Sequence, residues 1–413
     1  MKVAVLHPGT QHSRQTALAL QQLGRLAFLA TGMFSADRDA LDRLAQGLPR
    51  PLASRLQRER ARFAFAALDP SHVLTFPRYE LPERLARRAG LRGLAERLDL
   101  TGNRGFGHRV ARLVQAEGPF AMWGFDGSAF ASFADPRCAG MPRILDRTIA
   151  DGRHWNAELS AIRETHGDWL LPGERGWSEA QIARDEAEYR HATHILCGSP
   201  FAAETVRRYA RSEGVAAKLR VLPYPFDAAL FGNAPAPRPV GKGEPVQFLF
   251  VGQVTARKGI HHLLEAIARL DILDAQLTVA GPIEVPRKML APYADRVSFV
   301  GPVARADVPA LMQRHHVLVL PSHFEGSAIV LPEAMASGLA LIHTQASGLG
   351  ASDVSGILLD RPSADGVKAA MAALCANRDR LLEMRRAAQV ESAARSFAAY
   401  RDRIAHFLRG AGL

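Results

Sequence analysis

The sequence predicts an α/β fold of two doubly wound, Rossmann-like domains, and three observations carry this prediction. The chain has 413 residues, more than the roughly 250–300 residues at which a single hydrophobic core stops growing. Residues 229–245 are rich in proline and glycine, as linkers are. Before and after them, short apolar runs alternate with helical segments, which is typical of a parallel sheet covered by helices. We expect a first domain over residues 1–228, a second over residues 246–390 and a last helix over residues 391–413.

The first domain opens with a strand over residues 2–6, a glycine turn and a helix over residues 13–23. A strand, turn and helix in this order form the first unit of a Rossmann-like domain. The turn holds Gly9, Thr10 and Gln11, and Gly9 lets the backbone approach a ligand, although the turn is no G-x-G-x-x-G fingerprint. A plain tight turn is the alternative. The pattern predicts further strands over residues 26–31, 119–125, 142–146, 192–198 and 219–222.

Asp126 directly follows the predicted strand at residues 119–125. Open α/β sheets bind ligands in the crevice at the carboxyl ends of their strands. Asp126 is therefore a candidate for the ligand-facing side of the first domain, with a capping or turn role as the alternative.

The formal charge of +11 is concentrated in one region. Residues 41–112 hold 15 Arg against 7 Asp and Glu, a net charge of +8. Such a region can meet an anionic membrane or a lipid-phosphate acceptor, or it can supply solvated helix faces. Aromatic residues do not interleave with the arginines as a base-stacking platform requires, and no nucleic-acid motif occurs. We expect no nucleic-acid partner, and peripheral membrane contact stays open beside the solvated faces.

Composition and cysteine usage bound the protein class. A hydrophobic share of 47% is ordinary for a globular chain, and no stretch approaches the roughly 18 apolar residues of a spanning helix. Residues 1–9 are too short for the apolar region of a signal peptide. Cys138, Cys197 and Cys375 show no pairing or metal-like spacing. We expect a cytoplasmic protein, able to work at the inner face of the membrane, without a metal site.

The second domain alternates strand and helix cleanly, and from residue 363 onward the chain is helical. The pattern predicts strands over residues 246–251, 276–280, 297–300, 317–320 and 339–343. It predicts helices over residues 259–270, 306–314 and 328–337.

Two acidic residues lie in and after the loop between the predicted strand at residues 317–320 and the predicted helix at residues 328–337. Glu325 falls in the loop, and Glu333 follows eight residues later on the helix, so both carboxylates can face one crevice. Between them, Gly326, Ser327 and Ala328 offer small side chains and backbone N–H groups at a helix start, which suits an anion. Two solvated surface acids are the alternative.

The run Pro-Ser-x-x-Glu-Gly, continued by Glu-Ala-Met-Ala-x-Gly over residues 321–338, resembles the donor-binding signature of the retaining glycosyltransferases of family 4, the glycosyl transferases group 1. The resemblance implies the GT-B fold, in which a cleft separates two Rossmann-like domains and the last helix crosses back onto the first. It implies that Glu333 binds the ribose of a nucleotide-diphosphate sugar, since one carboxylate can accept from two hydroxyls. It implies that Glu325 holds the donor sugar.

A second motif follows the first strand of the second domain. Gly252 and Gln253 begin it, and Arg257, Lys258 and Gly259 end it, so two adjacent cations can surround a diphosphate. The resembled family places an Arg after the first glycine and a Lys before the last. Lys258 matches the second position, whereas Gln253 stands in the first, and Arg257 is our substitute. The resemblance implies that these cations stabilise the leaving β-phosphate without a divalent metal. Ordinary surface charges are the alternative.

The resemblance also implies a histidine of the first domain beside the donor sugar, and His154 is the nearest candidate. An imidazole can donate to or accept from a sugar hydroxyl near neutral pH. A packing or capping histidine is the alternative. The same resemblance puts the turn of Gly9, Thr10 and Gln11 beside the acceptor or the donor.

Together these features predict a retaining glycosyltransferase that moves a sugar from a nucleotide-diphosphate sugar to a glycan or lipid-linked acceptor, with no bound cofactor. A sugar-nucleotide epimerase or hydrolase on the same scaffold would also bind the donor. A non-catalytic carbohydrate- or membrane-binding module is the alternative from another class.

Overall fold

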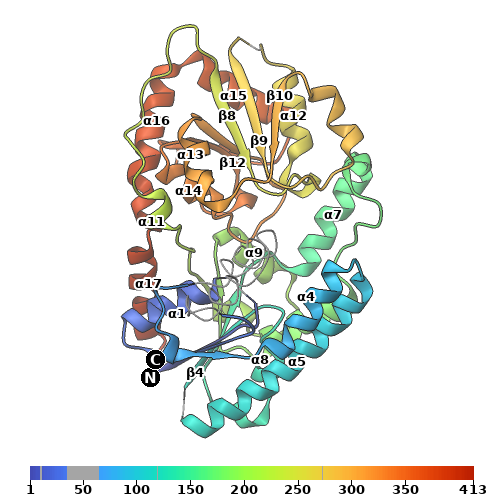
Figure 1. Ribbon diagram of the computed structural model, residues 1–413, viewed down its shortest axis with the longest axis vertical. Coiled ribbons are helices and arrows are strands. Elements are labelled where there is room, and N and C mark those ends of the chain that lie inside the picture. Colours follow the sequence, from blue (N-terminus) through green and yellow to red (C-terminus); the bar gives the residue numbers. More distant parts are fainter. Residues whose placement is uncertain (10–11, 35–64, 119, 272) are drawn as a thin grey trace, which may run out of the picture.

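The computed structural model describes residues 1–9, 12–34, 65–118, 120–271 and 273–413, which form two parallel sheets (Figure 1). The first sheet has the strand order β3-β2-β1-β4-β5-β6-β7, and the second has the order β10-β9-β8-β11-β12-β13. In both, the order reverses beside the first strand of the domain, and this switch point opens a crevice at the strand ends. The prediction of two Rossmann-like domains is confirmed.

The strands of the first sheet follow the predicted positions closely, with one addition. That addition is a short, partly exposed strand in the basic region, where the pattern fixed no strand order. Its three residues carry no apolar run long enough to stand out from the helices around it. The strands are β1 (Val3–Leu6), β2 (Leu26–Thr31), β3 (Val73–Thr75), β4 (Ala121–Phe125), β5 (Arg143–Arg147), β6 (His194–Cys197) and β7 (Leu219–Val221).

Helices cover both faces of the first sheet, and capping side chains fix where several of them begin. Asp151 accepts from the backbone of Arg153 at the start of α7, and Ser199 caps α9 with proline at its first position. The helices are α1 (Ser13–Gln22), α4 (Leu81–Arg88), α5 (Arg92–Glu117), α6 (Phe130–Phe133), α7 (Gly152–His166), α8 (Glu179–His191), α9 (Pro200–Tyr209) and α10 (Val215–Lys218).

Part of the basic region forms the helical pair α4 and α5, which lie side by side along the lower right of the first domain in Figure 1. Residues 41–64 of that region lie outside the described residues. Within the described residues, no helix combines the length and apolar character needed to cross a bilayer.

The second domain keeps the predicted alternation and adds an edge strand, β13 (Gly356–Leu359), which the pattern did not predict. Its strands are β8 (Val246–Val251), β9 (Ala275–Ala280), β10 (Val297–Gly301), β11 (Val317–Leu320), β12 (Ala340–Thr344) and β13 (Gly356–Leu359). Its helices, with those of the linker and the C-terminal segment, are α11 (Ala228–Phe231), α12 (Ile260–Ala268), α13 (Val308–Gln313), α14 (Val330–Ala336), α15 (Ala364–Ala376), α16 (Arg378–Glu391) and α17 (Phe397–Gly410).

The last helix returns to the first domain. Figure 1 shows α16 and α17 running along one side of the molecule, so that both chain ends lie at the same end. Tyr400, Ile404 and Leu408 of α17 are buried in the core of the first domain, and the Tyr400 hydroxyl lies 2.8 Å from Oγ1 of Thr16 on α1. The predicted crossing of the last helix is confirmed.

The loop after β11 is packed directly against the first domain. A Cβ atom at Gly326 would lie 1.7 Å from the backbone oxygen of Thr148, so no larger residue fits this contact. The hydroxyl of Ser199 donates to the backbone oxygen of Gly326 at 2.5 Å. The two domains are therefore closed on each other at the predicted site.

Candidate active site

A cavity of about 340 Å³ lies between the two domains, beside the strand ends of the second sheet. We call it the interdomain cavity. Four of the predicted residues line it together: Gly252, Lys258, Ala328 and Glu333. The remaining lining residues come from both domains and include Gln15, Pro225, Asp227, Val251, Arg305, Val308, Ile329 and Val330.

The backbone around Lys258 is fixed by its neighbours. The 3-10 turn η5 (Ala256–Lys258) begins at Thr255, whose hydroxyl accepts from the backbone N–H of Lys258 at 3.3 Å. Gly259 follows with φ +71°, and a Cβ atom there would lie 2.0 Å from the backbone oxygen of Pro321. The loop that carries Lys258 therefore packs against the start of the loop that carries Glu325.

Glu325 is buried and contacts both predicted cations. Its Oε1 lies 2.7 Å from Nζ of Lys258 and 2.9 Å from Nη1 of Arg257, and only 7% of the residue is exposed. Burial alone would raise the pKa of Glu325, but Lys258 and Arg257 hold it below its ordinary value. This carboxylate therefore stays ionised at neutral pH and fixes the position of the Lys258 amine.

Arg257 does not line the interdomain cavity. Its guanidinium lies over the rings of Trp155 and Phe324, 5.4 and 5.5 Å from their centroids, and it donates to the backbone oxygen of Phe324 at 2.9 Å. The substitute cation chosen from the sequence thus faces α7 rather than the cavity.

Glu333 lies on the cavity wall and pairs with a residue that the sequence analysis missed. Its Oε1 lies 2.5 Å from Nη2 of Arg305, and only 3% of Glu333 is exposed. Burial raises the pKa of Glu333, although Arg305 opposes this shift. Arg305 stands in a short turn before α13, and no local motif marks it, because its partner is distant in sequence.

The small-residue loop differs from the expected anion site. Helix α14 begins at Val330 rather than at residue 328, so the predicted helix start was wrong by two residues. Contacts of Gly326 with the first domain hold this stretch as a loop. The backbone N–H of Ala328 donates to the oxygen of Ser347 at 3.0 Å, and Ser327 packs against the first domain near Gly198. At least one of the expected backbone donors is therefore already engaged.

Gln253 and His154 lie away from the interdomain cavity. The Gln253 amide donates to Oε1 of Glu284 at 3.1 Å in an exposed contact. The ring of His154 lies at the edges of Phe201 and Phe324, with centroids 5.4 and 5.9 Å away, and burial lowers its pKa. Its Nε2 is buried and has no hydrogen-bond partner among the described residues, so a role of His154 beside the donor sugar stays a prediction.

The acceptor-side candidates of the first domain share a second cavity, of about 460 Å³, which we call the first-domain cavity. Gly9 and Asp126 both line it, and arginines and acids from α4, α5 and α8 surround them. One carboxylate oxygen of Asp126 accepts from the hydroxyl of Thr148 at 2.7 Å. Thr10 and Gln11 lie outside the described residues.

A buried carboxyl group also ends β5 in the first domain. Asp146 accepts from the indole of Trp123 at 3.1 Å and from the hydroxyl of Tyr224. Burial raises its pKa to about 7, against the effect of these two donors. The ring of His12 stacks on Tyr224 with centroids 3.7 Å apart, so this group supports the face of the first domain that meets the cleft.

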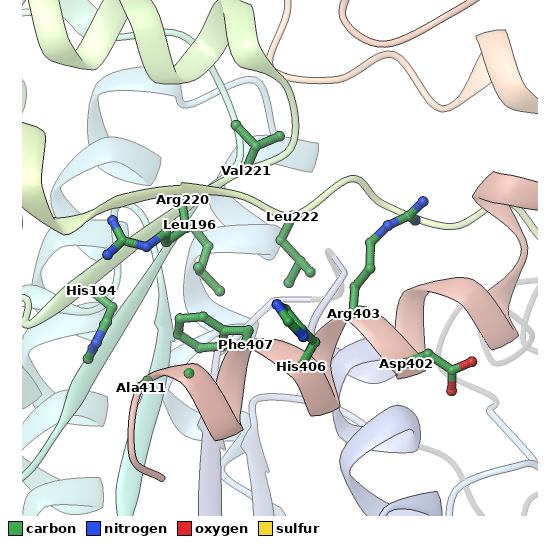
Figure 2. A pocket seen from close by; sticks show the side chains of 11 residues that line it. His194, Leu196, Arg220, Val221, Leu222, Asp402, Arg403, His406, Phe407 and Ala411 are labelled. Atoms are coloured by element: carbon green, nitrogen blue, oxygen red, sulfur yellow. The ribbon is translucent and has the colours of Figure 1, made fainter.

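Figure 2 shows a further cavity, of about 510 Å³, between α17 and strands β6 and β7. His194, Arg220, His406 and Phe407 stand on its walls. None of the predicted site residues lines it, and neither does any residue of the second domain. This cavity is therefore separate from the site of Glu325, Glu333 and Lys258.

Comparison with known proteins finds a family model that matches most of the second domain. Residues 245–377 match the model of the family described as Glycosyl transferases group 1. The match contains every second-domain residue that lines the interdomain cavity. The predicted resemblance to the glycosyl transferases group 1 is confirmed over this stretch of the chain.

Two relatives from Mycobacterium tuberculosis are similar in sequence. A glycogen synthase is 34% identical over 149 residues, which is 34% of this chain and 35% of that protein. The chain thus spans about a third of this relative's length. A GDP-mannose-dependent alpha-(1-6)-phosphatidylinositol monomannoside mannosyltransferase is 28% identical over 301 residues, covering 67% of this chain and 72% of that protein.

Two solved structures share the whole architecture. HepE from Anabaena, in complex with UDP, covers 99% of this chain and 100% of its own, with a TM-score of 0.62 and 14% identity. Sucrose-phosphate synthase from Thermosynechococcus elongatus covers 99% and 98%, with a TM-score of 0.66 and 18% identity. At such identities the likeness concerns the fold alone, and it confirms the predicted two-domain GT-B fold.

Proposed function

We propose that this chain, whose residues 245–377 match the model of the family Glycosyl transferases group 1, is a retaining glycosyltransferase that moves a sugar from a nucleotide-diphosphate sugar to a glycan or lipid-linked acceptor. The observation that carries the proposal is the interdomain cavity, which Lys258 and Glu333 of the second domain line together with Gln15 of the first. A cation and a carboxylate in one cleft suit the diphosphate and the ribose of one donor.

Lys258 supplies the positive charge for the leaving group. Negative charge grows on the β-phosphate as the glycosidic bond breaks, and a preorganised amine stabilises that charge without reorganising first. Glu325 fixes the Lys258 amine at 2.7 Å and thereby acts as a positioning residue. Its other predicted role, contact with the donor sugar, remains part of the proposal.

Glu333 accepts from the two ribose hydroxyls of the bound donor. In the structure its carboxylate pairs with Arg305, whose side chain is 55% exposed and can move toward solvent or toward the α-phosphate. The donor therefore competes with an ion pair that is partly screened by water.

The transfer itself breaks the bond between the anomeric carbon and the β-phosphate oxygen. The acceptor oxygen forms its bond to the same face of that carbon, and its proton passes to the leaving phosphate oxygen. Closure of the two domains excludes the water that would otherwise hydrolyse the donor. The reaction uses the donor as co-substrate and calls on no resident cofactor or catalytic metal.

The compared proteins support a nucleotide sugar without selecting its base. HepE was solved with UDP-glucose as well as with UDP, whereas the mycobacterial mannosyltransferase is named for GDP-mannose. Product analysis tests the proposal. Release of nucleoside diphosphate that depends on the acceptor, with the donor's anomeric configuration kept in the product, supports it. Release without an acceptor indicates a hydrolase, a changed donor sugar indicates an epimerase, and neither change indicates a binding module.

We also propose that α4 and α5 touch an anionic membrane surface. Leu85 and Leu94 are 56% and 48% exposed, whereas Arg84 and Arg87 of this helical pair form ion pairs with Glu80 and Glu83. Exposed apolar side chains in a region with a net charge of +8 favour binding to anionic lipid. The name of the mannosyltransferase relative includes a phosphatidylinositol mannoside, which agrees with a lipid-linked acceptor.

Vesicle co-sedimentation tests this contact. Binding to anionic vesicles should fall steeply with salt, because charges farther apart than about 8 Å are screened at physiological ionic strength. Replacing Leu85 and Leu94 by Gln should reduce binding, whereas Leu273→Gln on the second domain, where the leucine is 74% exposed, should not. Sedimentation that is independent of salt, or absent, rejects the membrane contact.

A further inference from the structure

Four histidines from the two domains meet at one place, which we call the histidine cluster. His166 ends α7 of the first domain, His261 and His262 stand in the first turn of α12, and His323 lies in the loop after β11. The ring centroid of His261 lies 4.3 Å from that of His166 and 3.9 Å from that of His262. The ring of His323 lies 5.6 Å from His261.

The histidine cluster leaves ring nitrogens without partners. Both nitrogens of His261 and Nε2 of His323 are buried and have no hydrogen-bond partner among the described residues. His261 is 3% exposed, so water reaches these nitrogens poorly. A buried polar group without a partner is costly, and a cluster of them indicates a missing ligand.

A neutral imidazole keeps a lone pair on one ring nitrogen for coordination. An acidic side chain also lies beside the histidine cluster. Glu158 of α7 lies 3.7 Å from Nδ1 of His323, and a carboxylate in that place offsets added positive charge.

We propose that His166, His261 and His262 bind one Zn²⁺ or a similar imidazole-preferring divalent ion, with water in the fourth position and His323 beside it. Their nearest ring nitrogens all lie within 4.8 Å of one another. A tetrahedral site with Zn–N distances of about 2.0–2.1 Å needs nitrogens about 3.3 Å apart, which small rotations of the rings provide. Imidazole ligands suit zinc, copper and nickel, whereas magnesium and calcium prefer oxygen.

The site would hold the two domains in the closed arrangement. Helix α12 begins directly after Lys258 and Gly259, and the backbone N–H of His323 donates to the oxygen of Arg257 at 2.8 Å. One ion on α7 and α12 therefore ties the first domain to the loop that carries Lys258. This structural role goes beyond the proposed transfer reaction and stands against the expectation that the chain has no metal site.

Cobalt titration of the untagged, metal-stripped protein tests the proposal directly. We expect one Co²⁺ per chain, with the strong visible absorption of a tetrahedral nitrogen site, displacement by equimolar Zn²⁺, and a higher melting temperature with either metal. His166→Gln should weaken Co²⁺ binding by about tenfold or more. His406→Gln, at an exposed histidine of α17, is the matched control and should bind as the parent protein does.

Two results would overturn the proposal. Absence of saturable binding near one ion per chain removes the site. Equal Co²⁺ affinity in His166→Gln and the parent protein removes the bridge between the domains. His262→Asn is the second variant, and equal metal-free melting temperatures of variants and parent show that loss of binding does not come from unfolding. Because the readout is metal binding, failure here leaves the proposed transfer reaction untouched.

Discussion

Each domain has a buried carboxyl group near the carboxyl end of one of its strands. One of these groups lies beside cations, and the other lies beside neutral hydrogen-bond donors. Glu325, after β11, contacts two cations, and its pKa is held below the ordinary value. Asp146, at the end of β5, faces an indole and a phenol, and burial raises its pKa to about 7. The surroundings of each group therefore set its charge: those of Glu325 favour the ionised form, and those of Asp146 favour the protonated form.

This difference separates two tasks. The Glu325 carboxylate stays charged and holds the amine of Lys258, which in the proposed function stabilises the leaving phosphate. A carboxyl group held by Trp123 and Tyr224 serves as a hydrogen-bonding support for the packed first domain. In the proposed function, the second domain therefore stabilises charge on the donor, and the first domain supports the cleft.

The largest effect should come from removing the amine of the second domain. Lys258→Ala should reduce turnover by about 10²–10³, the usual loss when one preorganised donor to a developing charge is removed. Donor binding should fall less. Steady-state kinetics with the donor measures both quantities, and Lys288→Ala at an exposed lysine of the same domain is the control. Equal losses of turnover in Lys258→Ala and Lys288→Ala would contradict the assignment of Lys258 to the leaving phosphate.

Glu325→Gln should destabilise the fold by about 3 kcal/mol, because it leaves Lys258 and Arg257 without their shared anion in a poorly solvated place. The folded pKa of Glu325 lies below its ordinary value of 4.5, so its contribution is complete above about pH 4.5 and is lost as the pH falls through the folded value. Urea unfolding should therefore give the same difference from the parent protein at pH 5 and pH 8. A difference that vanishes at pH 8 contradicts the ion pairs.

Asp146→Asn should show the opposite pH behaviour. Folded Asp146 keeps its proton up to about pH 7, whereas the unfolded chain releases it near its ordinary value of 3.8. The stability of the parent protein therefore falls across this interval, while the amide variant is spared. Between pH 5 and pH 8, the stability difference should move in favour of the variant by at least about 1 kcal/mol. The same urea series measures it, and no change with pH would show that Asp146 is ionised when folded.

Arg305→Ala should produce the smallest effect that is still measurable. Arg305 pairs with Glu333 from a half-exposed position, so its loss should change nucleotide affinity by less than about tenfold. Titration calorimetry measures this change with the nucleotide that raises the melting temperature of the parent protein. Gln253→Ala, whose amide contacts Glu284 away from the cavity, should leave affinity unaltered. A larger loss of affinity in Gln253→Ala than in Arg305→Ala would instead show that Gln253 contacts the nucleotide, as the arginine at this position does in the resembled family.

Local pattern predicted the second domain well. Strands β8 and β11 have the predicted bounds, because fully buried parallel strands are continuous apolar runs ended by turn residues. The short strand β3 is partly exposed and lies among helices, so no run distinguished it. The glutamate motif likewise marked Glu325 and Glu333, since both lie in one strand-loop-helix unit.

Contacts between residues far apart in the chain could not be predicted from the sequence. Arg305 of the turn before α13 meets Glu333 of α14 only in the folded domain, 28 residues further along the chain, and nothing near Arg305 marks it. His154 was chosen by its order in the chain, but its ring packs among aromatic residues. His166 and His261 stand on different domains, so no spacing rule could join them.

The most direct measurement is a thermal-shift screen of the parent protein and Glu333→Ala against UDP, GDP, ADP and TDP and their sugar conjugates. A ligand of the folded state adds about 2.7 kcal/mol at a hundredfold excess over its dissociation constant, which the melting temperature reports. We predict that one nucleotide raises the melting temperature of the parent protein and that Glu333→Ala loses most of this rise. No rise with any nucleotide, or an equal rise in the variant, would contradict the donor site.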